Sequence, residues 1–468
     1  MGTKQGLWIS SLLAKAGIFL IVCLLGFALV AQERTAEEKR ADVERQKAEM
    51  ERLNRIFERD PVRYQDSLRT IWTKKYQTEA HLRLTKYRST DVSKLEEIDL
   101  SYGQLTEIPS FVFDAKALKT LILDYNSIRV LPKQLNALDS LKKIYWRQNS
   151  LGASKPKIAK LENVKKLTLD GNGLTKISGL KRLPNLEVLE LKQNKFSEIP
   201  ITAIKRNTQL KELSLGENPL VLGKARYDRI AFLKILKLNK ANLTAFDSSL
   251  YNISGLEELQ FQENNLTTLP QGISKLTRLT KFSVYKNKLV SLPSDFFELK
   301  NLAIADLYYN DLETLPAEIG QLTNLQIFYF SHNRIFSVPS EIGQLKKLHE
   351  LYLHHNRLSV LPSSIGQLDS LRIVRVNDNY LTEFPMSLLH LSQLEQIDIN
   401  NNMISTLPEE IEHMKKLSLF TFLDNNVELH HPDNAHVAYM IERMLKRGVQ
   451  CLPRIYREEI ETQSDQAE

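Results

Sequence analysis

Cysteine is nearly absent from this sequence of 468 residues. Its two cysteines are Cys23 and Cys451, and Cys23 lies in a very apolar segment near the N-terminus. If that segment is removed or enters a membrane, Cys451 has no partner left. The composition therefore excludes a fold held by disulfides and a metal site built from cysteines.

Glycine and proline are also scarce, with 17 and 16 residues, so nothing resembles a flexible linker or a collagen-like segment. The formal net charge of +7 is small for this length, and no basic stripe accompanies it. We therefore expect no nucleic-acid partner. The hydrophobic content of 42% and the charged content of 25% are those of a folded protein.

One long apolar run stands at the N-terminus. The segment "AGIFLIVCLLGFALVA", Ala16 to Ala31, carries no charge and follows Lys4 and Lys15. It predicts either an export signal cleaved after Ala31 or, if Lys15 snorkels, an uncleaved anchor over residues 7–31. A buried helix of a cytosolic protein is the third reading. Residues 1–31 are thus expected to place the remaining chain in the cell envelope or outside the cell.

Two helical segments are expected next. Residues 32–59 are rich in both acids and bases, which predicts a solvated helical spacer. Residues 60–94 are interpreted as an N-terminal helical cap, because Asp60 suits an N-cap and Pro61 the first helical turn. An apolar stripe on this helix is expected to pack against the segment that follows: Tyr64, Leu68, Ile71 and Trp72.

Residues 95–431 repeat one pattern, LxxLxLxxN, in about fifteen copies. The spacing is 23 residues except for one interval of 22 and one of 24. A fixed period of this length predicts a solenoid, in which each copy can bury its apolar face only by stacking on its neighbours. The first residues of the copies are Leu95, Leu118, Leu141, Val164, Leu186, Leu210, Leu233, Leu256, Leu279, Leu302, Leu325, Leu348, Leu371, Leu394 and Leu417.

The regular copies carry a fuller form, LxxLxLxxNxLxxLPxxIGxL, as in "LYYNDLETLPAEIGQLTNL". This pattern resembles the leucine-rich repeat family over about three quarters of the chain. The fuller form is similar to the repeats of Scribble-type and Ras-binding-type scaffolds and of bacterial leucine-rich repeat proteins. The resemblance implies an α/β solenoid shaped as a horseshoe, with a parallel β-sheet on a concave face that binds other macromolecules.

The alternation within LxxLxLxx agrees with this fold, because it places the leucines on one side of a short strand and the variable residues on the other. The asparagine of each copy is expected to bond backbone groups of neighbouring turns. These ladder residues are Asn126, Asn149, Asn172, Asn194, Asn218, Asn264, Asn287, Asn310, Asn333, Asn356, Asn379, Asn402 and Asn425.

Some parts of the array depart from the pattern. Gly103 and Ala241 stand in the asparagine slot, and less uniform turns are expected over residues 141–255 because several copies there lack the Leu-Pro step.

Residues 432–457 are predicted to form a C-terminal helical cap that ends at Gly448. Residues 458–468 form a polar tail. The apolar face of the cap is expected to comprise Val437, Met440, Ile441, Met444 and Leu445.

The outward positions of four consecutive copies, with one arginine from the next, are unusually rich in aromatic residues. Neighbouring strands lie about 4.8 Å apart, so these side chains should form one continuous patch. Tyrosine is enriched where interfaces concentrate their binding energy, and we expect protein binding here. The proposed binding residues are Tyr285, Tyr308, Tyr309, Tyr329, His332, Tyr352, His354, His355 and Arg375.

A second aromatic group lies near the N-terminal end of the array, and its members are Tyr102, Tyr125, Tyr145 and Arg147. In the main patch, His332 and His355 occupy equivalent slots of adjacent copies, but no third ligand joins them, and we expect no metal site. Because histidine titrates near neutrality, a pH-dependent interaction is expected between roughly pH 5.5 and 7.5.

Catalytic motifs are missing: the sequence has no glycine-rich phosphate loop, nucleophile elbow or HExxH. A triad can be chosen across strands, for example Ser331, His354 and Asp306. It is weak evidence for catalysis, because serine and aspartate are common in the outward slots. We therefore predict no enzyme activity and no cofactor. The function expected is recognition of a protein by the concave face of an exported or membrane-anchored chain. Binding of a glycan or cell-wall polymer, and a cytosolic signalling scaffold, are the alternatives.

Overall fold

The computed structural model describes residues 61–152, 157–428 and 432–452. The chain divides into two compact units, Met1–Glu79 and Ala80–Glu468. The expected signal or anchor, the charged spacer, Asp60 and the polar tail lie outside the described residues. Among the described residues, no helix is long and apolar enough to cross a membrane.

A single parallel sheet of sixteen strands runs through the second unit, with each strand bonded to the next along the chain. Each strand pairs with the strand of the next copy, and equivalent residues of the two copies lie opposite each other. Leu351 of β14, for example, pairs with Val374 of β15. The strands are β1 (Glu97–Asp99), β2 (Thr120–Ile122), β4 (Lys143–Tyr145), β6 (Lys166–Thr168), β7 (Val188–Glu190), β8 (Glu212–Ser214), β9 (Ile235–Lys237), β10 (Glu258–Gln260), β11 (Lys281–Ser283), β12 (Ile304–Asp306), β13 (Ile327–Tyr329), β14 (Glu350–Tyr352), β15 (Ile373–Arg375), β16 (Gln396–Asp398), β17 (Leu419–Thr421) and β18 (Gln450–Leu452).

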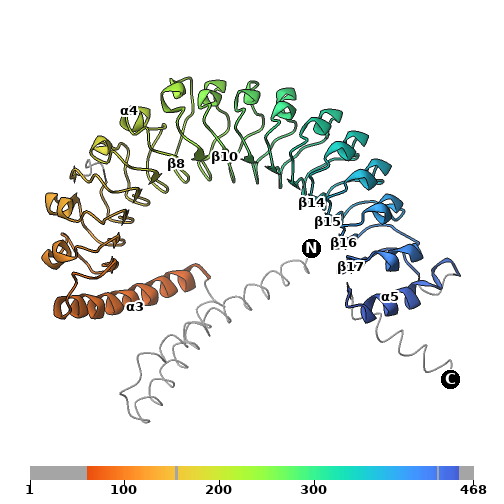
Figure 1. Cartoon of the computed structure of the whole chain (residues 1–468), viewed down its shortest axis with the longest axis horizontal. Helices are drawn as coiled ribbons and strands as arrows, with labels where there is room; N and C mark the ends of the chain where they lie inside the picture. The colour runs from red at the N-terminus through yellow and green to blue at the C-terminus, as the bar shows by residue number, and fades with distance from the viewer. Residues whose placement is uncertain (1–60, 153–156, 429–431, 453–468) are drawn as a thin grey trace, which may run out of the picture. The chain divides into compact units, whose positions relative to one another are not determined.

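Short helical turns form the opposite side of this unit, and Figure 1 shows the strands on the inner side of its curve and the turns on the outer side. Apart from α4 (Ile201–Ile204), these turns are single 3₁₀ segments. They are η2 (Ser110–Asp114), η3 (Lys133–Ala137), η4 (Leu180–Arg182), η5 (Tyr227–Ile230), η6 (Ser248–Asn252), η7 (Ile273–Lys275), η8 (Ser294–Glu298), η9 (Ala317–Gln321), η10 (Ser340–Gln344), η11 (Ser363–Gln367), η12 (Met386–His390), η13 (Glu409–His413) and η14 (Pro432–Asn434).

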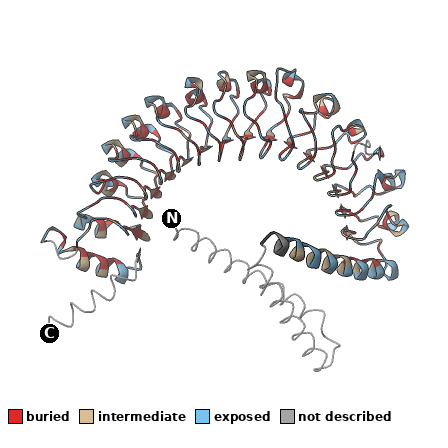
Figure 2. Cartoon of the chain, turned by 180° about the vertical axis from the view of Figure 1, so that it is seen from behind, coloured by how far each residue is buried: buried red, intermediate tan, exposed pale blue. Residues whose placement is uncertain are grey.

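The core lies between the strands and the outer turns, where Figure 2 shows the buried residues in red. In the copy that begins at Leu348, Leu351, Leu353 and Leu358 are fully buried. The two strand leucines are separated by one residue and therefore point to the same side, as the alternation predicts. The predicted solenoid with a parallel sheet and leucine core is confirmed.

The asparagine ladder is confirmed as well. Asn356 donates from Nδ2 to the carbonyl oxygens of Phe330 and Leu353 at 3.1 and 3.0 Å. Its Oδ1 accepts from the backbone N–H of Ile335 at 3.3 Å. One amide thus joins two neighbouring copies, and most other ladder asparagines make the same type of contact. Gly103 occupies this slot in the first copy, where no preceding copy needs to be joined.

The irregular block differs in its outer side. Strands β3 (Val130–Leu131) and β5 (Lys157–Ile158) form a separate two-stranded sheet. In the copy that begins at Leu141, the described residues include β5 where the other copies have a helical turn. This confirms the expectation that turns over residues 141–255 are less uniform.

The two caps deviate in part from expectation. Helix α3 (Pro61–Ser89) lies within the predicted N-terminal cap, but Ile71 of the expected apolar stripe is exposed, and Ala80 and Leu84 are the buried ones among the side chains described on this helix. Helix α5 (Val437–Lys446) buries Val437, Met440, Ile441 and Met444 as predicted. Leu445 is exposed, contrary to expectation. After Gly448, whose φ is 86°, the chain forms β18, a sixteenth strand that the repeat pattern did not predict.

Candidate functional site

All nine residues of the predicted site lie on the strand side of the second unit, on strands β13 to β15 or in the turns that follow strands β11 to β14. We call these nine residues the aromatic patch. Tyr309 and His355 are exposed, and the other seven are half-buried. The patch spans five consecutive copies, and its members contact one another in three parallel rows.

The first row lies on the strands themselves. The rings of Tyr329 and Tyr352 stack with centroids 4.8 Å apart and planes inclined by 20°. The guanidinium of Arg375 lies 5.6 Å from the centre of the Tyr352 ring. Tyr352 also donates its hydroxyl to Glu350 at 2.7 Å. Strand register places these three side chains side by side, because Tyr329, Tyr352 and Arg375 are direct partners.

The second row follows the strands by two residues. Tyr285 and Tyr308 stack at 5.6 Å and 18°, and His354 lies 5.7 Å from Tyr308. Between them in register is Ser331, which is fully buried and whose Oγ lies 2.8 Å from Nδ1 of His354. This contact fixes the imidazole ring of His354 within the row.

The third row occupies the next position along each copy. His332 is placed between Tyr309, with ring centroids 4.0 Å apart, and His355, at 3.9 Å. Nε2 of His355 lies 3.2 Å from Oδ2 of Asp378. The third row therefore consists of three aromatic rings followed by the carboxylate of Asp378.

The residues of the third row have left-handed backbone conformations, with φ of 56° for Tyr309, 50° for His332 and 52° for His355. Asparagine and aspartate tolerate this region best, and both occur at the same slot nearby as Asp378 and Asn401. A bulky residue in this conformation costs about 1 kcal/mol. Glutamine, glutamate and lysine occupy this slot with the same conformation in other copies, so the backbone does not select the aromatic rings found here.

Sequence reasoning missed an apolar component of this surface. The first residues of β12, β13 and β15 are Ile304, Ile327 and Ile373, which are half-buried and share the outward face of their strands. Charged residues occupy this slot in many other copies, such as Glu97 and Lys166. A change from charge to isoleucine at one slot was the signal that could have identified these residues.

Burial changes the proton affinity of two histidines in the patch. Burial and the neighbouring His355 lower the pKa of His332 to about 4. Burial, His332 and His355 lower the pKa of His354 to the same value. These two histidines therefore gain their charge at a pH below the interval of 5.5 to 7.5. The prediction that binding changes within this interval is wrong for them.

These lowered pKa values predict a dependence of stability on pH. The unfolded chain binds protons at a histidine pKa near 6.5, above the folded value, so stability rises with pH. The contribution is complete above about pH 6.5 and is lost as the pH falls through about 4. We expect the urea midpoint to fall between about pH 7 and about pH 4.5, and to fall less in His354→Gln. An equal fall in both proteins would contradict this assignment.

No catalytic arrangement emerges at the patch. Asp306 does not bond His354 but accepts from the hydroxyl of Ser283 at 2.7 Å, and Ser331 is fully buried. Within the described residues, no group of three or more histidine, cysteine, aspartate or glutamate residues is arranged to hold a metal ion.

The second aromatic group also assembles. Tyr102 and Tyr125 stack at 4.4 Å and 8°. Arg147 donates to Asp124 through Nε and Nη2 at 2.8 and 2.6 Å, and its guanidinium lies 5.4 Å from the Tyr145 ring. Because Asp124 is buried, it fixes Arg147 firmly at the surface.

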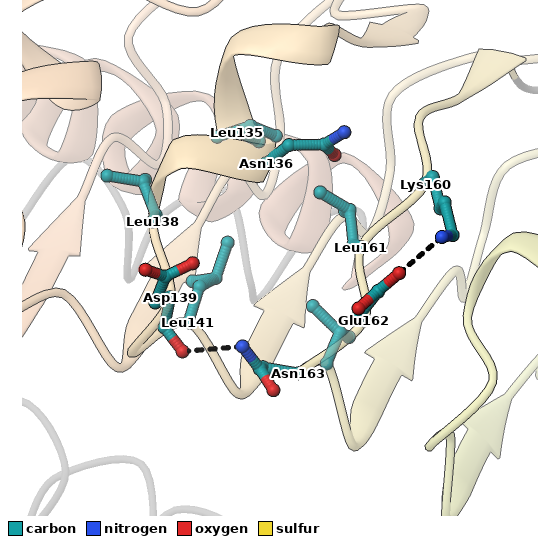
Figure 3. Close-up of a pocket in the computed structure, with 10 residues that line it drawn as sticks. Leu135, Asn136, Leu138, Asp139, Leu141, Lys160, Leu161, Glu162 and Asn163 are labelled. Atoms are coloured by element: carbon teal, nitrogen blue, oxygen red, sulfur yellow. Dashed lines mark hydrogen bonds and ion pairs between the residues drawn. The ribbon is translucent and has the colours of Figure 1, made fainter.

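A pocket of about 300 Å³ lies elsewhere, beside the copy that has β5 in place of a helical turn. Figure 3 shows Asn163 bonding the carbonyl oxygen of Asp139, at 2.9 Å, and the ion pair of Lys160 with Glu162. These polar groups bond one another, so the pocket presents no reactive arrangement. Its apolar lining comprises Leu135, Leu138, Leu141, Leu161 and Val164.

Comparisons with known proteins agree with the repeat architecture. The Leucine rich repeat family matches residues 93–151, 162–220 and 347–368. None of the curated proteins compared matches the chain. A leucine-rich repeat protein of Leptospira interrogans is 26% identical with a TM-score of 0.61, and the alignment covers 78% of this chain and 97% of that one.

Two further solved structures show the same fold. An internalin of Listeria monocytogenes is 20% identical with a TM-score of 0.53, over 72% of this chain and 86% of the internalin. A plant peptide hormone receptor in complex with RGF2 is 26% identical with a TM-score of 0.51, over 71% of this chain and 55% of the receptor. With sixteen parallel strands, a leucine core and an asparagine ladder, the chain is a leucine-rich repeat protein.

Proposed function

We propose that this protein is a non-enzymatic binding protein that recognises a polypeptide segment of another protein through the aromatic patch. The observation that carries the proposal is the set of three rows, in which tyrosine and histidine rings lie on the strand side and are half-buried or exposed. Tyrosine offers a large contact area together with a hydroxyl, and few rotatable bonds are fixed on binding.

The stacking geometry favours a protein over a glycan. Sugar rings stack on the open faces of aromatic rings, but Tyr329 and Tyr352 cover each other's faces at 4.8 Å. His332 is covered on both sides by Tyr309 and His355. Such rows present ring edges and hydroxyl groups to a partner, which suits hydrogen bonds with peptide groups and contacts with apolar side chains.

The comparison with solved structures supports this choice. The plant receptor with 26% identity is a peptide hormone receptor and was solved as a complex. Leucine-rich repeat proteins are typically binding proteins rather than enzymes. Within the proposal, Tyr308, Tyr329 and Tyr352 act as anchors and the isoleucines on the same face provide an apolar border.

We include export in the proposal, because the run from Ala16 to Ala31 has the composition of a signal or an anchor. It places the array on the far side of a membrane, whereas a cytosolic scaffold would need another explanation for this run. Mass determination of the N-terminus of the protein recovered from cells separates a cleaved from a retained segment. Fractionation separates both from a cytosolic protein.

The experiment for the patch uses random peptides displayed on phage and selected on the purified chain. Changing Tyr308, Tyr329 and Tyr352 to serine together should weaken the selected peptides by at least about thirtyfold, since central aromatic residues supply most of the energy of an interface. Isothermal titration calorimetry measures the affinity. Tyr380→Ser is the matched control, because Tyr380 is exposed and lies outside the patch.

A second variant separates loss of binding from loss of folding. Tyr309→Asn places a residue suited to the left-handed conformation at this slot, so the urea midpoint should stay level or rise. Its peptide affinity should nevertheless fall. A triple variant that binds within twofold of the parent protein, or a selection that enriches no peptide, would show that the patch is not the binding site.

A further inference from the structure

The carboxylates around the aromatic patch all have partners within the chain. Asp306 accepts from Ser283 at 2.7 Å, and Glu350 accepts from Tyr352 at 2.7 Å. Asp378 is bonded by the amides of Asn377 and Asn401, at 2.6 and 2.8 Å, and pairs with His355. Asp398 accepts from the hydroxyl of Thr421 at 2.9 Å. Each of these carboxylates is thus held by hydrogen bonds within the chain, and none of them pairs with Arg375 among the interactions of the described residues.

Arg375 differs from these groups. It is the one arginine or lysine among the nine patch residues, and its guanidinium lies against the Tyr352 ring at 5.6 Å. Asp398 is its direct partner in strand register, yet the two form no ion pair among the interactions of the described residues. Its side chain is half-buried at the end of the strand row.

Arg375 has no ion-pair partner among the described residues, unlike other cations of this region. Other cations near the patch are neutralised, because Lys286 pairs with Glu263 at 3.2 Å. A guanidinium presents five N–H donors in a planar arrangement that matches a carboxylate, and no carboxylate in the described part of the chain bonds those of Arg375.

We infer that Arg375 receives an acidic side chain of the bound polypeptide, so that the partner's segment carries an aspartate or glutamate next to the residues that meet the tyrosines. This inference rests on the proposed function and names the chemistry of its partner. The Tyr352 ring lies beside the guanidinium, with its centre 5.6 Å away, and offers no carboxylate to the N–H donors of Arg375. Ile373, on the same outward face of β15, keeps an apolar surface beside the ion pair.

The test uses the peptide library selected on the purified chain, and it counts aspartate and glutamate among the enriched sequences. Selection on the parent protein should enrich an acidic residue at a fixed distance from an apolar one. Selection on Arg375→Gln should lose that enrichment while it still yields peptides. Arg372→Gln is the matched control, since Arg372 lies on the same copy and already pairs with Glu395 at 2.8 Å.

A double-mutant cycle gives the quantitative result. Synthetic peptides are amidated at the C-terminus, so that only side chains carry a carboxylate. Replacing the selected acidic residue by its amide should weaken binding to the parent protein about tenfold, as expected for a hydrogen bond between charged groups. The same replacement should change binding to Arg375→Gln by less than about twofold, because the coupled charge is gone.

The outcomes are distinguishable. If peptides are enriched and depend on the tyrosines, but carry no acidic preference or keep it on Arg375→Gln, the inference fails and the proposed function stands. If no peptide is enriched, both fail. Asp398→Asn serves as a further control: removal of this neighbouring negative charge should leave the acidic preference unchanged or strengthen it, and loss of the preference would contradict the inference.

Discussion

Asn356→Ala is expected to destabilise the protein by about 4 kcal/mol, because one buried amide serves several backbone groups at once. In the parent chain its Nδ2 donates to the carbonyl oxygens of Phe330 and Leu353, and its Oδ1 accepts from the N–H of Ile335. Alanine leaves the N–H of Ile335 buried without its acceptor. Each buried group left unpaired costs roughly 1–3 kcal/mol, and the ladder asparagines are almost fully buried.

The measurement is the shift of the urea midpoint, followed by circular dichroism. Asn356→Asp keeps the shape and the acceptor but cannot donate to the two carbonyl groups, so it should also lose most of this stability. Arg357→Ala, at the exposed next residue, should stay within about 0.5 kcal/mol of the parent. If Asn356→Ala unfolds at the same midpoint as Arg357→Ala, the ladder does not stabilise the array in the way described.

The ladder and the strands could be predicted from the sequence because the same local geometry recurs in every copy. Fifteen copies at a nearly constant spacing placed Leu351 and Leu353 in the core and Tyr352 outside it, and both assignments hold. The outward register then identified the nine patch residues as neighbours. Which of these nine residues bind a partner depends on the chemistry of that partner, and the repeat pattern carries no information about the partner.

Other features depend on contacts between copies that a repeat pattern does not encode. Strand β18 contains no leucine pattern of its own, and its pairing with β17 follows from the way α5 closes the array. The pKa values of His332 and His354 fall because rings from adjacent copies bury them. The sequence likewise could not show that Arg375 lacks an ion-pair partner. Asp398 in the next strand has the register that such an ion pair requires.

Gly255→Ala is the second substitution with a large expected effect. Gly255 immediately precedes the first leucine of its copy, a slot where other copies carry asparagine, such as Asn301 and Asn324. The side chains of those asparagines donate hydrogen bonds to backbone carbonyl oxygens of the preceding copy, at 2.8 and 2.7 Å. The sequence pattern alone would therefore predict that a side chain is tolerated at residue 255.

The structure predicts the opposite. A Cβ atom on Gly255 would lie 2.1 Å from the carbonyl oxygen of Ala231 and 2.9 Å from that of Leu233. Both obstacles are backbone, so relief requires neighbouring copies to move apart, at about 3 kcal/mol. Gly223→Ala is the matched control in the same irregular block, because nothing lies within 4 Å of its Cβ position. It should change stability by less than about 1 kcal/mol. Equal urea midpoints for the two variants would mean that the copies around residue 255 are not packed this closely.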